Sequence, residues 1–391
     1  MSLLGKANDV RIRRSDIRST DGGLPALVGS SPSTGSLSVM SYNLLAEAHM
    51  WSLYDPIPDE AKDWEARRAL LVDEIVRVNA DVVALQEAPL PTFDAEFRVP
   101  LEAAGYVSVL QNDKGRAETH ETANAILYKA DAFEMVFENH RSRTLIAGLV
   151  PIVEGRPTQS QLAQAVASAE AAVLAEEEAK DGKKLSKKAL KKALAKTRKA
   201  VTRPIKDALA ESLFFVVCGH LQGHPERVLT RIQQIRSALV KGVAPAVSEW
   251  QGQDAKLSDA RILICADFND EQDALVCDLL RQGSLPAGAS QTVRDKVIVT
   301  EKDVDLAGAQ FASAYATVWG AEPVMTFKAP TFRPSAIDFV FYSPSSFVPV
   351  AAMDAVEDSY DDLLASSLPT TVHGSDHLPI AVVFDAPFLT T

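Results

Sequence analysis

Gly374-Ser375-Asp376-His377-Leu378-Pro379 is the stretch that decides the fold, because it sets an acid and an imidazole directly before an apolar run. That run, Ile380-Ala381-Val382-Val383-Phe384, is typical of a buried strand. A carboxylate and a histidine at the mouth of a strand can bind a divalent cation and a phosphate together. An Asp-His dipeptide alone also suits an ordinary loop, so the rest of the chain has to decide between these interpretations.

Four upstream stretches have the same build, with polar residues beside a short apolar run. They are Ser41-Tyr42-Asn43, Leu85-Gln86-Glu87, Gly219-His220-Leu221 and Ala266-Asp267-Phe268-Asn269. Asp338 also interrupts the apolar run of residues 336–342, and a buried carboxylate needs a partner, for which His377 is the natural candidate. Together these stretches make a hydrolase the leading hypothesis.

Composition bounds the class of protein. The chain has 391 residues, 47% of them hydrophobic, and a net charge of −12, so its average surface does not indicate a nucleic-acid binder. Its three cysteines have no metal-ligand spacing and indicate buried thiols of a reducing compartment. No run of about 18 apolar residues occurs, so no membrane contact is expected. Acidic residues interrupt the N-terminal arginines, which favours a cytoplasmic protein over an organellar one, with organelle and nucleus left open.

The predicted organisation is a flexible leader over residues 1–36 followed by one catalytic domain over residues 37–386. Apolar runs predict strands at 37–44, 81–87, 106–110, 124–128, 133–137, 213–218, 261–266, 324–327, 336–342 and 380–384. Helical patterns lie between them, as at residues 92–104 and from about 225 onward. Hairpin-like strand pairs break the alternation, so we expect two packed mixed β-sheets with helices outside.

The acidic stretches predict a metal site. Phosphodiester hydrolysis needs a metal to polarise the phosphate, a base for water, and donors for the developing charge. Glu87, with Asn43 and Asp376 near it, supplies the hard oxygen ligands that Mg²⁺ prefers. We therefore expect Mg²⁺ as the cofactor, with Mn²⁺ able to replace it.

The remaining polar residues predict the acid–base groups. Asp267 is placed to take a proton from water, and Asn269 to orient that water. His220 and His377 can donate to phosphate oxygens. Asp338 is expected to fix the tautomer of His377 and raise its basicity.

The polar stretches, in their order, resemble the endonuclease/exonuclease/phosphatase superfamily. The matching motifs are Ser41-Tyr42-Asn43, Leu85-Gln86-Glu87, His220-Leu221, Asp267-Phe268-Asn269, Ile337-Asp338-Phe339 and Ser375-Asp376-His377. The resemblance implies a four-layer αββα sandwich and Mg²⁺-dependent cleavage of phosphoesters. Asn43-Leu44-Leu45, Trp64-Glu65-x-Arg67 and the strand from Ile337 to Ser343 look most like the deadenylase, Angel and nocturnin branch.

Some positions depart from that pattern. Ala266 stands where the family usually has glycine, and Gln222-Gly223-His224-Pro225 is not a deadenylase signature. No leucine-rich repeats precede the domain, so docking to a deadenylase complex is not implied. The resemblance therefore supports catalysis but not selectivity for adenine. The other histidines are expected in loops or at the surface, with His224 near the active site: His49, His120, His140, His224 and His373.

Residues 155–206 differ in composition from the rest and predict a helical, Lys-rich hairpin inserted into the domain. Lys180–Lys206 contains 12 basic residues and one acidic residue, which leaves the rest of the chain at −23. Such a concentration of charge can follow a phosphate backbone or contact a protein. A solvated helix face paired with acidic neighbours explains it as well.

These features favour a Mg²⁺-dependent 3′→5′ exoribonuclease that resembles deadenylases and releases nucleoside 5′-monophosphates. The alternatives are a phosphatase or phosphodiesterase of a small nucleotide and an endonuclease on DNA. A third alternative is an inactive scaffold that binds RNA or a partner through Lys180–Lys206. The complete set of acidic residues and histidines argues against it.

Overall fold

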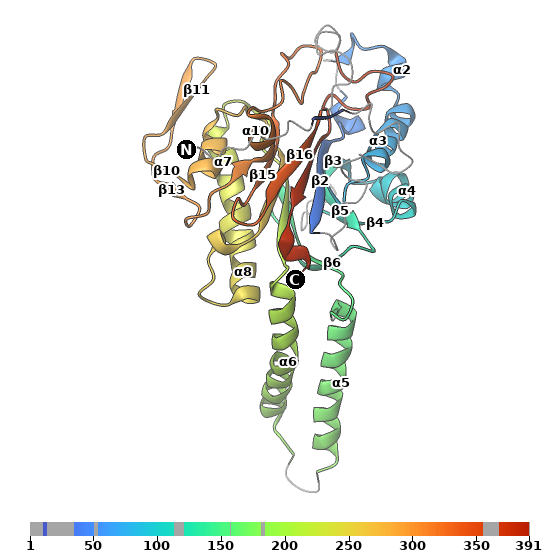
Figure 1. The fold of residues 1–391 in the computed structure, drawn as a ribbon, viewed down its shortest axis with the longest axis vertical. Helices are drawn as coiled ribbons and strands as arrows, with labels where there is room; N and C mark the ends of the chain where they lie inside the picture. The colour runs from blue at the N-terminus through green and yellow to red at the C-terminus, as the bar shows by residue number, and fades with distance from the viewer. Residues whose placement is uncertain are drawn as a thin grey trace, which may run out of the picture.

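Two mixed β-sheets pack face to face in the computed structural model, which describes residues 11–13, 35–50, 54–112, 121–156, 158–180, 184–354 and 367–390. The first sheet has the order β1-β16-β17-β2-β3-β5-β4 and the second the order β14-β15-β9-β8-β7-β6. Figure 1 shows α3 and α4 on one flank of the sheets, and α7 and α8 on the other. The predicted four-layer αββα fold with an inserted helical hairpin is confirmed.

The strands of the first sheet are β1 (Arg11–Arg13), β16 (Val348–Asp354), β17 (Ile380–Asp385), β2 (Ser36–Asn43), β3 (Val82–Pro89), β5 (Thr122–Lys129) and β4 (Tyr106–Leu110). Those of the second are β14 (Ala312–Ser313), β15 (Asp338–Tyr342), β9 (Ile262–Asp267), β8 (Phe214–His220), β7 (Thr144–Pro151) and β6 (Phe133–His140). The helices are α2 (Asp59–Lys62), α3 (Trp64–Val78), α4 (Val99–Ala103), α5 (Gln159–Glu178), α6 (Lys187–Ala210), α7 (Val228–Arg236), α8 (Ala244–Gln251), α9 (Leu275–Gln282) and α10 (Ala314–Trp319). Short strands β10 (Ser284–Leu285), β11 (Ser290–Val293), β12 (Lys296–Val299) and β13 (Val304–Asp305) form two small ribbons beside α9.

Three apolar layers hold these elements together. The middle layer lies between the two sheets and includes Val39, Leu145 and Val340, all fully buried. The outer layers pack helices onto the sheets, α3 through residues such as Ile75 and α7 through residues such as Ile232. The sheets therefore have fixed relative positions beneath the edge at which their polar residues meet.

The structure corrects three local predictions. Residues 324–327 do not form a strand, because Phe327 makes only single bridges to Ser335 and His377. The strands β7 and β16 had no predicted counterpart; β7 contains Gly148 and ends at Pro151, which read as turn signals. The helix predicted at 92–104 is present, but its first part, Asp94–Arg98, is π-helical and continues directly into α4.

The predicted leader, residues 1–36, and the predicted insert, residues 155–206, lie outside the regular alternation of strands and helices. Within the first 36 residues, β1 pairs parallel with β16, whereas most of the predicted leader lies outside the described residues. Residues 155–206 contain α5 and most of α6, which extend together away from the sheets (Figure 1). Arg198 lies 2.8 Å from Glu170 across these helices, and Lys206 pairs with Glu249 of α8. No helix among the described residues is long and apolar enough to cross a membrane.

The loop before β17 is fixed by a fully buried arginine. Arg67 of α3 donates from Nη1 to the carbonyls of Leu45 and Gly374, at 2.8 Å each. Gly374 also packs against the helix so closely that an added Cβ would lie 2.7 Å from the Arg67 carbonyl oxygen. The Gly374-Ser375-Asp376-His377 loop is thus attached to α3 as well as to its own strand.

We expect Gly374→Ala to lower stability by about 1–3 kcal/mol, because the new methyl group meets backbone that cannot move aside. The measurement is thermal unfolding, compared with Gly223→Ala, whose added Cβ would make only an ordinary 3.4 Å contact. An equal melting temperature for the two variants would show that the loop is not held against α3.

Candidate active site

Strand ends of both sheets meet at one cleft of about 1050 Å³. In the first sheet, β2 and β3 run parallel; β2 ends with Asn43, which lies opposite Gln86, and Glu87 follows Gln86 in β3. In the second, β8 and β9 run parallel with His220 opposite Asp267. Because β15 is antiparallel to β9, its first residue, Asp338, lies opposite Asp267. The topology therefore brings together side chains that are far apart in the sequence.

All the predicted site residues lie at this edge. Six of them line the cleft: Glu87, His220, Asp267, Asn269, Asp376 and His377. The other two are buried at the same edge, with Asn43 1% and Asp338 2% exposed.

Asn43 links the two sheets. Its amide nitrogen donates to Asp267 Oδ2 at 3.0 Å and to Glu87 Oε1 at 3.3 Å. Its carbonyl oxygen accepts from the Leu45 backbone amide at 3.0 Å. In this arrangement Asn43 holds two carboxylates in position, and it turns donors, not an oxygen, toward them.

Backbone strain is concentrated beside the cleft. Leu45, Glu87 and Asn269 have φ values of 47°, 55° and 50°, in the left-handed region that side chains other than glycine rarely adopt. At Glu87 the pairing of β3 with β5 shifts between Leu85 and Ala88, as in a β-bulge. Bulges and strained residues of this kind often direct side chains at functional sites. The Glu87 carboxylate is thereby aimed into the cleft.

His377 and Asp338 form a buried pair. His377 Nδ1 lies 2.8 Å from Asp338 Oδ2, which also accepts from Thr326 Oγ1 at 2.6 Å. Burial lowers the pKa of His377, but the charges of Asp338 and Asp376 and the bond to Asp338 outweigh it and hold this pKa well above the usual value. His377 is therefore a cation at neutral pH, with Nε2 directed toward Asp267 Oδ2 at 3.8 Å.

The two carboxylates that Asn43 links have very different acidities. Burial raises the pKa of Asp267 to about 7, and the neighbouring charge of Asp338 acts in the same direction. Burial also raises the pKa of Glu87, but the His49 hydrogen bond and the charges of His220, His49 and His377 bring it to about 2. Glu87 is thus a permanent anion, whereas Asp267 can exchange a proton near neutral pH.

His220 differs from His377 in charge. Burial lowers the pKa of His220 to about 4, against the attraction of Glu87. Its Nε2 lies 3.6 Å from Asp267 Oδ2 and 3.8 Å from Glu87 Oε1. A neutral imidazole at this position can donate one hydrogen bond to a ligand oxygen without adding a positive charge.

Three residues of the cleft, His49, Tyr54 and Arg143, were not predicted from the sequence. His49 was expected in a loop or at the surface, but its Nδ1 lies 2.6 Å from Glu87 Oε2. Tyr54 donates to Asp376 Oδ2 at 2.6 Å. The Arg143 guanidinium lines the cleft and has no ion pair or hydrogen bond with any described residue. No local motif marks these positions, because each is brought to the cleft by a loop.

The donor set fits a hard divalent cation. Asp267, Asp338 and His377 offer ligand atoms within 4.8 Å of one another. The hydrogen bond between His377 Nδ1 and Asp338, and the strand pairing of Asp338 with Asp267, already account for this spacing. Glu87 fits better: its Oε1 has only longer contacts, at 3.3 Å to Asn43 and 3.8 Å to His220, and it faces the cleft. Mg²⁺ typically takes one or two carboxylates and keeps several waters, which suits this position.

The amino-acid sequence matches known proteins at low identity. The model of the Endonuclease/Exonuclease/phosphatase family matches residues 40–184. The CCR4-Not complex 3′-5′-exoribonuclease subunit Ccr4 of Kluyveromyces lactis is 22% identical over 361 residues, which cover 90% of this chain but only 41% of that protein. Carbon catabolite repressor protein 4 homolog 4 of Arabidopsis thaliana is 25% identical over 89% of this chain and 77% of its own length.

Solved structures share the fold. ANGEL2, described as a 2′,3′-cyclic phosphatase, aligns with a TM-score of 0.63 and 19% identity over 90% of this chain and 96% of its own. The catalytic domain of human Nocturnin aligns with a TM-score of 0.54 and 15% identity over 90% and 93%. Fold and site define the class as an αββα sandwich with an acid–histidine cluster at its strand ends. The chain is thus similar in sequence to the endonuclease/exonuclease/phosphatase family over residues 40–184 and similar in fold to these two structures.

We expect Asp338→Asn to lower kcat while leaving Mg²⁺ affinity largely intact, because its 2.8 Å partner is His377. The loss should be about 10- to 100-fold, the range found for outer partners of functional histidines. A Mg²⁺ titration of activity and of intrinsic fluorescence separates the two effects. Weakened Mg²⁺ binding with normal turnover at saturation would instead make Asp338 a metal ligand.

Proposed function

We propose that this chain is a metal-dependent phosphodiester hydrolase, and specifically a 3′→5′ exoribonuclease that releases nucleoside 5′-monophosphates. The observation that carries the proposal is the meeting of Asn43, Glu87, His220, Asp267 and His377 at one cleft from both sheets. The printed names of the Ccr4 relatives add RNA as the substrate class. The chain spans 41% of the Kluyveromyces relative, so that protein's activity supports a proposal only.

Asp267 is the proposed base. It would take a proton from water as the water oxygen attacks phosphorus, and the bond from phosphorus to the leaving 3′ oxygen would break. A group whose pKa lies near 7 is well matched to this exchange at neutral pH. The Asn269 backbone amide donates to Asp267 Oδ1 at 2.8 Å and so fixes the carboxylate from the other side.

Charge on the phosphate would be met by three groups. Glu87, with Asn43 and Asp376 beside it, is the proposed holder of Mg²⁺, which would polarise the phosphate when bound. The His377 cation and the neutral His220 would donate to non-bridging oxygens. Such preorganised donors are usually the largest single contribution to catalysis of this kind.

The outer cleft offers a place for a nucleobase. Phe332 lines it and is 48% exposed, and Pro225 lines the same cavity. Stacking on an aromatic ring stabilises any base by about 1–3 kcal/mol and does not require a particular sequence. This supports a nucleotide substrate without implying preference for adenine.

A small nucleotide is the second candidate substrate. The body of the protein carries −23 outside Lys180–Lys206, which opposes a long polyanion. The structural neighbour ANGEL2 is described as a 2′,3′-cyclic phosphatase. Assays with oligo(A), mixed RNA, DNA, a 2′,3′-cyclic phosphate end and nucleotide monophosphates, each with Mg²⁺, separate these alternatives. Release of 5′-monophosphates from RNA ends would favour the exoribonuclease.

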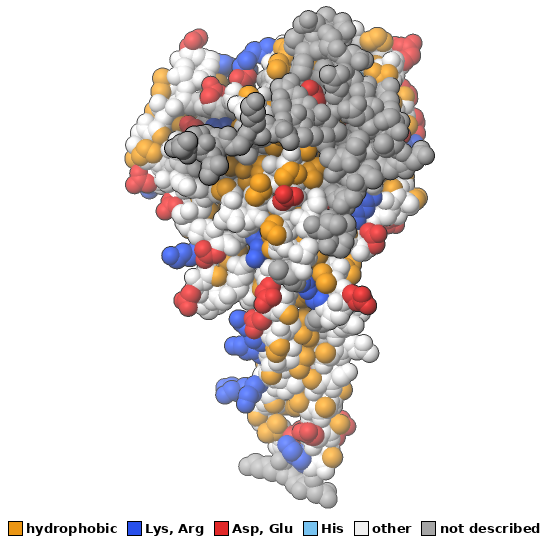
Figure 2. Space-filling view, viewed as in Figure 1, with side chains coloured by type: hydrophobic (Ala, Val, Ile, Leu, Met, Phe, Trp, Pro, Cys, Tyr) orange, Lys and Arg blue, Asp and Glu red, His pale blue; other side chains and the backbone are white. Residues whose placement is uncertain are grey.

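The hairpin of α5 and α6 is the proposed RNA contact outside the cleft. Figure 2 shows Lys and Arg side chains gathered along one side of this projection. Several lysines of α6 are exposed, and the rest of the chain would repel RNA. We also propose that the protein is cytoplasmic. A protein partner is the alternative ligand of α5 and α6.

We expect Glu87→Gln and Asp267→Asn each to reduce turnover at least about 100-fold, because one removes the metal-holding charge and the other the base. EDTA should act like the Glu87 change, and added Mg²⁺ or Mn²⁺ should restore the wild-type protein. Glu102→Gln on the exposed face of α4 is the matched control. Near-normal turnover of either variant at saturating Mg²⁺ would refute the assignment.

Replacing residues 163–203 with a short Gly/Ser bridge should raise KM for long RNA and flatten its salt dependence. The cut leaves the buried Leu162 and Leu209, and Leu209 packs in the apolar layer of α7 and the second sheet. Counterion release makes RNA affinity fall with salt in proportion to the phosphates contacted, so fewer lysines mean a smaller slope.

A dinucleotide, too short to reach the hairpin, should keep its rate in this deletion. A variant with Lys188, Lys192 and Lys199 changed to Gln keeps the helices and should show part of the same KM effect. Equal losses on long and short substrates would make the hairpin a structural part of the fold. No loss on either would indicate a protein-docking role.

A further inference from the structure

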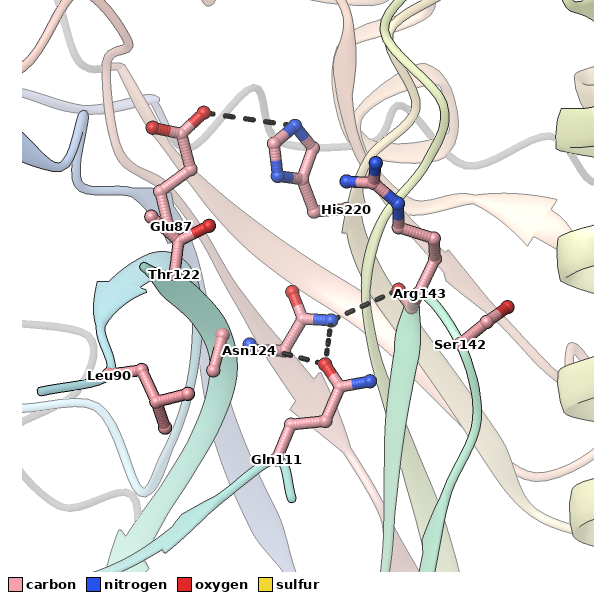
Figure 3. Close-up of a pocket in the computed structure, with 9 residues that line it drawn as sticks. Glu87, Leu90, Gln111, Thr122, Asn124, Ser142, Arg143 and His220 are labelled. Atoms are coloured by element: carbon pink, nitrogen blue, oxygen red, sulfur yellow. Dashed lines mark hydrogen bonds and ion pairs between the residues drawn. The ribbon is translucent and has the colours of Figure 1, made fainter. Parts of the chain in front are cut away.

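A small hollow lies directly beside the candidate active site. Its volume is about 60 Å³, and it shares Glu87, Arg143 and His220 with the large cleft. Figure 3 shows Asn124 and Gln111 at its inner end, with Glu87 and His220 at the other. A volume of this size admits groups the size of water or a hydroxyl, but not a nucleobase.

Hydrogen bonds fix the orientation of the Asn124 amide. Gln111 Nε2 donates to the carbonyls of Arg141 and Thr144, which leaves Gln111 Oε1 as an acceptor. Asn124 Nδ2 donates to that oxygen at 2.7 Å and to the Arg143 carbonyl at 3.0 Å. Both amide hydrogens are thus used, and neither is left to bind a ligand in the hollow.

The oxygen of Asn124 has no partner among the described residues, although the side chain is only 3% exposed. In Figure 3 it is directed to the side on which Glu87 and His220 lie. A buried acceptor without a donor is costly, and functional sites are a common reason for keeping one. The Asn124 oxygen therefore remains an acceptor that no donor of the described residues satisfies.

Arg143 adds a fixed cation at the mouth of the hollow. Its guanidinium lies next to His220 (Figure 3) and is not paired with any described carboxylate. The cleft beyond it is lined by Glu87, Asp267 and Asp376. An arginine with free donors recognises phosphate oxygens well. The hollow thus combines an acceptor for a hydroxyl with a donor for a phosphate.

We propose that the hollow is a ribose-hydroxyl subsite: Asn124 accepts the 2′-hydroxyl beside the leaving 3′ oxygen, and Arg143 binds the phosphate on the 5′ side of that ribose. The inference rests on the proposed function and makes the site selective for RNA over DNA. In-line displacement places the leaving oxygen opposite the attacking water. Because the water is activated at Asp267, the leaving ribose lies toward Glu87 and His220, where the hollow opens.

The test uses the full chain with Mg²⁺ and RNA tetranucleotides that carry either ribose or 2′-deoxyribose at the penultimate nucleotide. Wild type should lose about 5- to 50-fold in kcat/KM with the deoxy substrate, because Asn124 is then left unpaired. Asn124→Ala should discriminate little between the two. This comparison cancels the intrinsic effect of the 2′-hydroxyl on the leaving group, which is the same for both proteins. Equal discrimination by wild type and variant, or none by wild type, would mean that water alone fills the hollow and would overturn the proposal.

Arg143 gives an independent arm. Arg143→Met should remove the preference for a dinucleotide with a 5′-phosphate over one without, and Arg143→Lys should restore part of it. This arm decides the matter if Asn124→Ala does not fold. An unchanged preference in Arg143→Met would overturn the phosphate assignment. If the wild-type protein hydrolyses no RNA at all, both the proposed function and the ribose-hydroxyl subsite are wrong. If it hydrolyses RNA but shows neither effect, only the subsite is wrong.

Discussion

The Asn43 amide is the interaction on which the cleft depends, because it joins a carboxylate of each sheet. Glu87 belongs to the first sheet and Asp267 to the second, and both are almost fully buried. Two anions brought so close in a low-dielectric edge repel each other and lose hydration. A neutral double donor between them lowers that cost without cancelling either charge. The apolar layer between the sheets sets the separation at which one amide can reach both.

This arrangement distributes protons unevenly over similar groups. Glu87 stays ionised because histidines surround it, whereas Asp267 faces Asp338 across the β9–β15 pairing and has its pKa raised to about 7. The histidines divide in the same way: His377 gains a proton beside Asp338, and burial lowers the pKa of His220 to about 4. Pairs of like groups pushed apart in pKa are how one site obtains a fixed anion, a base, a cation and a neutral donor. The distinction comes from neighbours and burial, not from residue type.

Sequence patterns predicted those parts of the molecule that local order determines. Apolar runs that end in polar residues gave β2, β3, β8, β9, β15 and β17 to within two residues, and hence the two-sheet fold. The same runs predicted the site residues, because a polar side chain at the end of a buried strand lies at the edge of the sheet, outside the apolar core. His49, Tyr54 and Arg143 could not be found this way, because long-range packing alone brings their loops to the cleft. The positive φ of Glu87 was equally invisible, since a bulge depends on the register with β5 and leaves no mark in the run Leu85-Gln86-Glu87.

The cations of this protein lie in two places, on the exposed face of α6 and at the cleft, and they can act on a substrate at different distances. Free charges in solution are screened over about 8 Å at physiological ionic strength. The exposed lysines of α6 extend away from the cleft and therefore cannot alter bond breaking there, although they can attract a polyanion that the −23 of the remaining chain repels. Arg143 lies within contact distance of the cleft, where screening is weak, but one guanidinium cannot steer a long chain from solution. Under the proposed function, attraction and orientation of RNA are thus separate tasks assigned to separate cations. An RNA end that has reached the cleft would be selected by groups that have no partner among the described residues, such as the Arg143 guanidinium and the Asn124 oxygen.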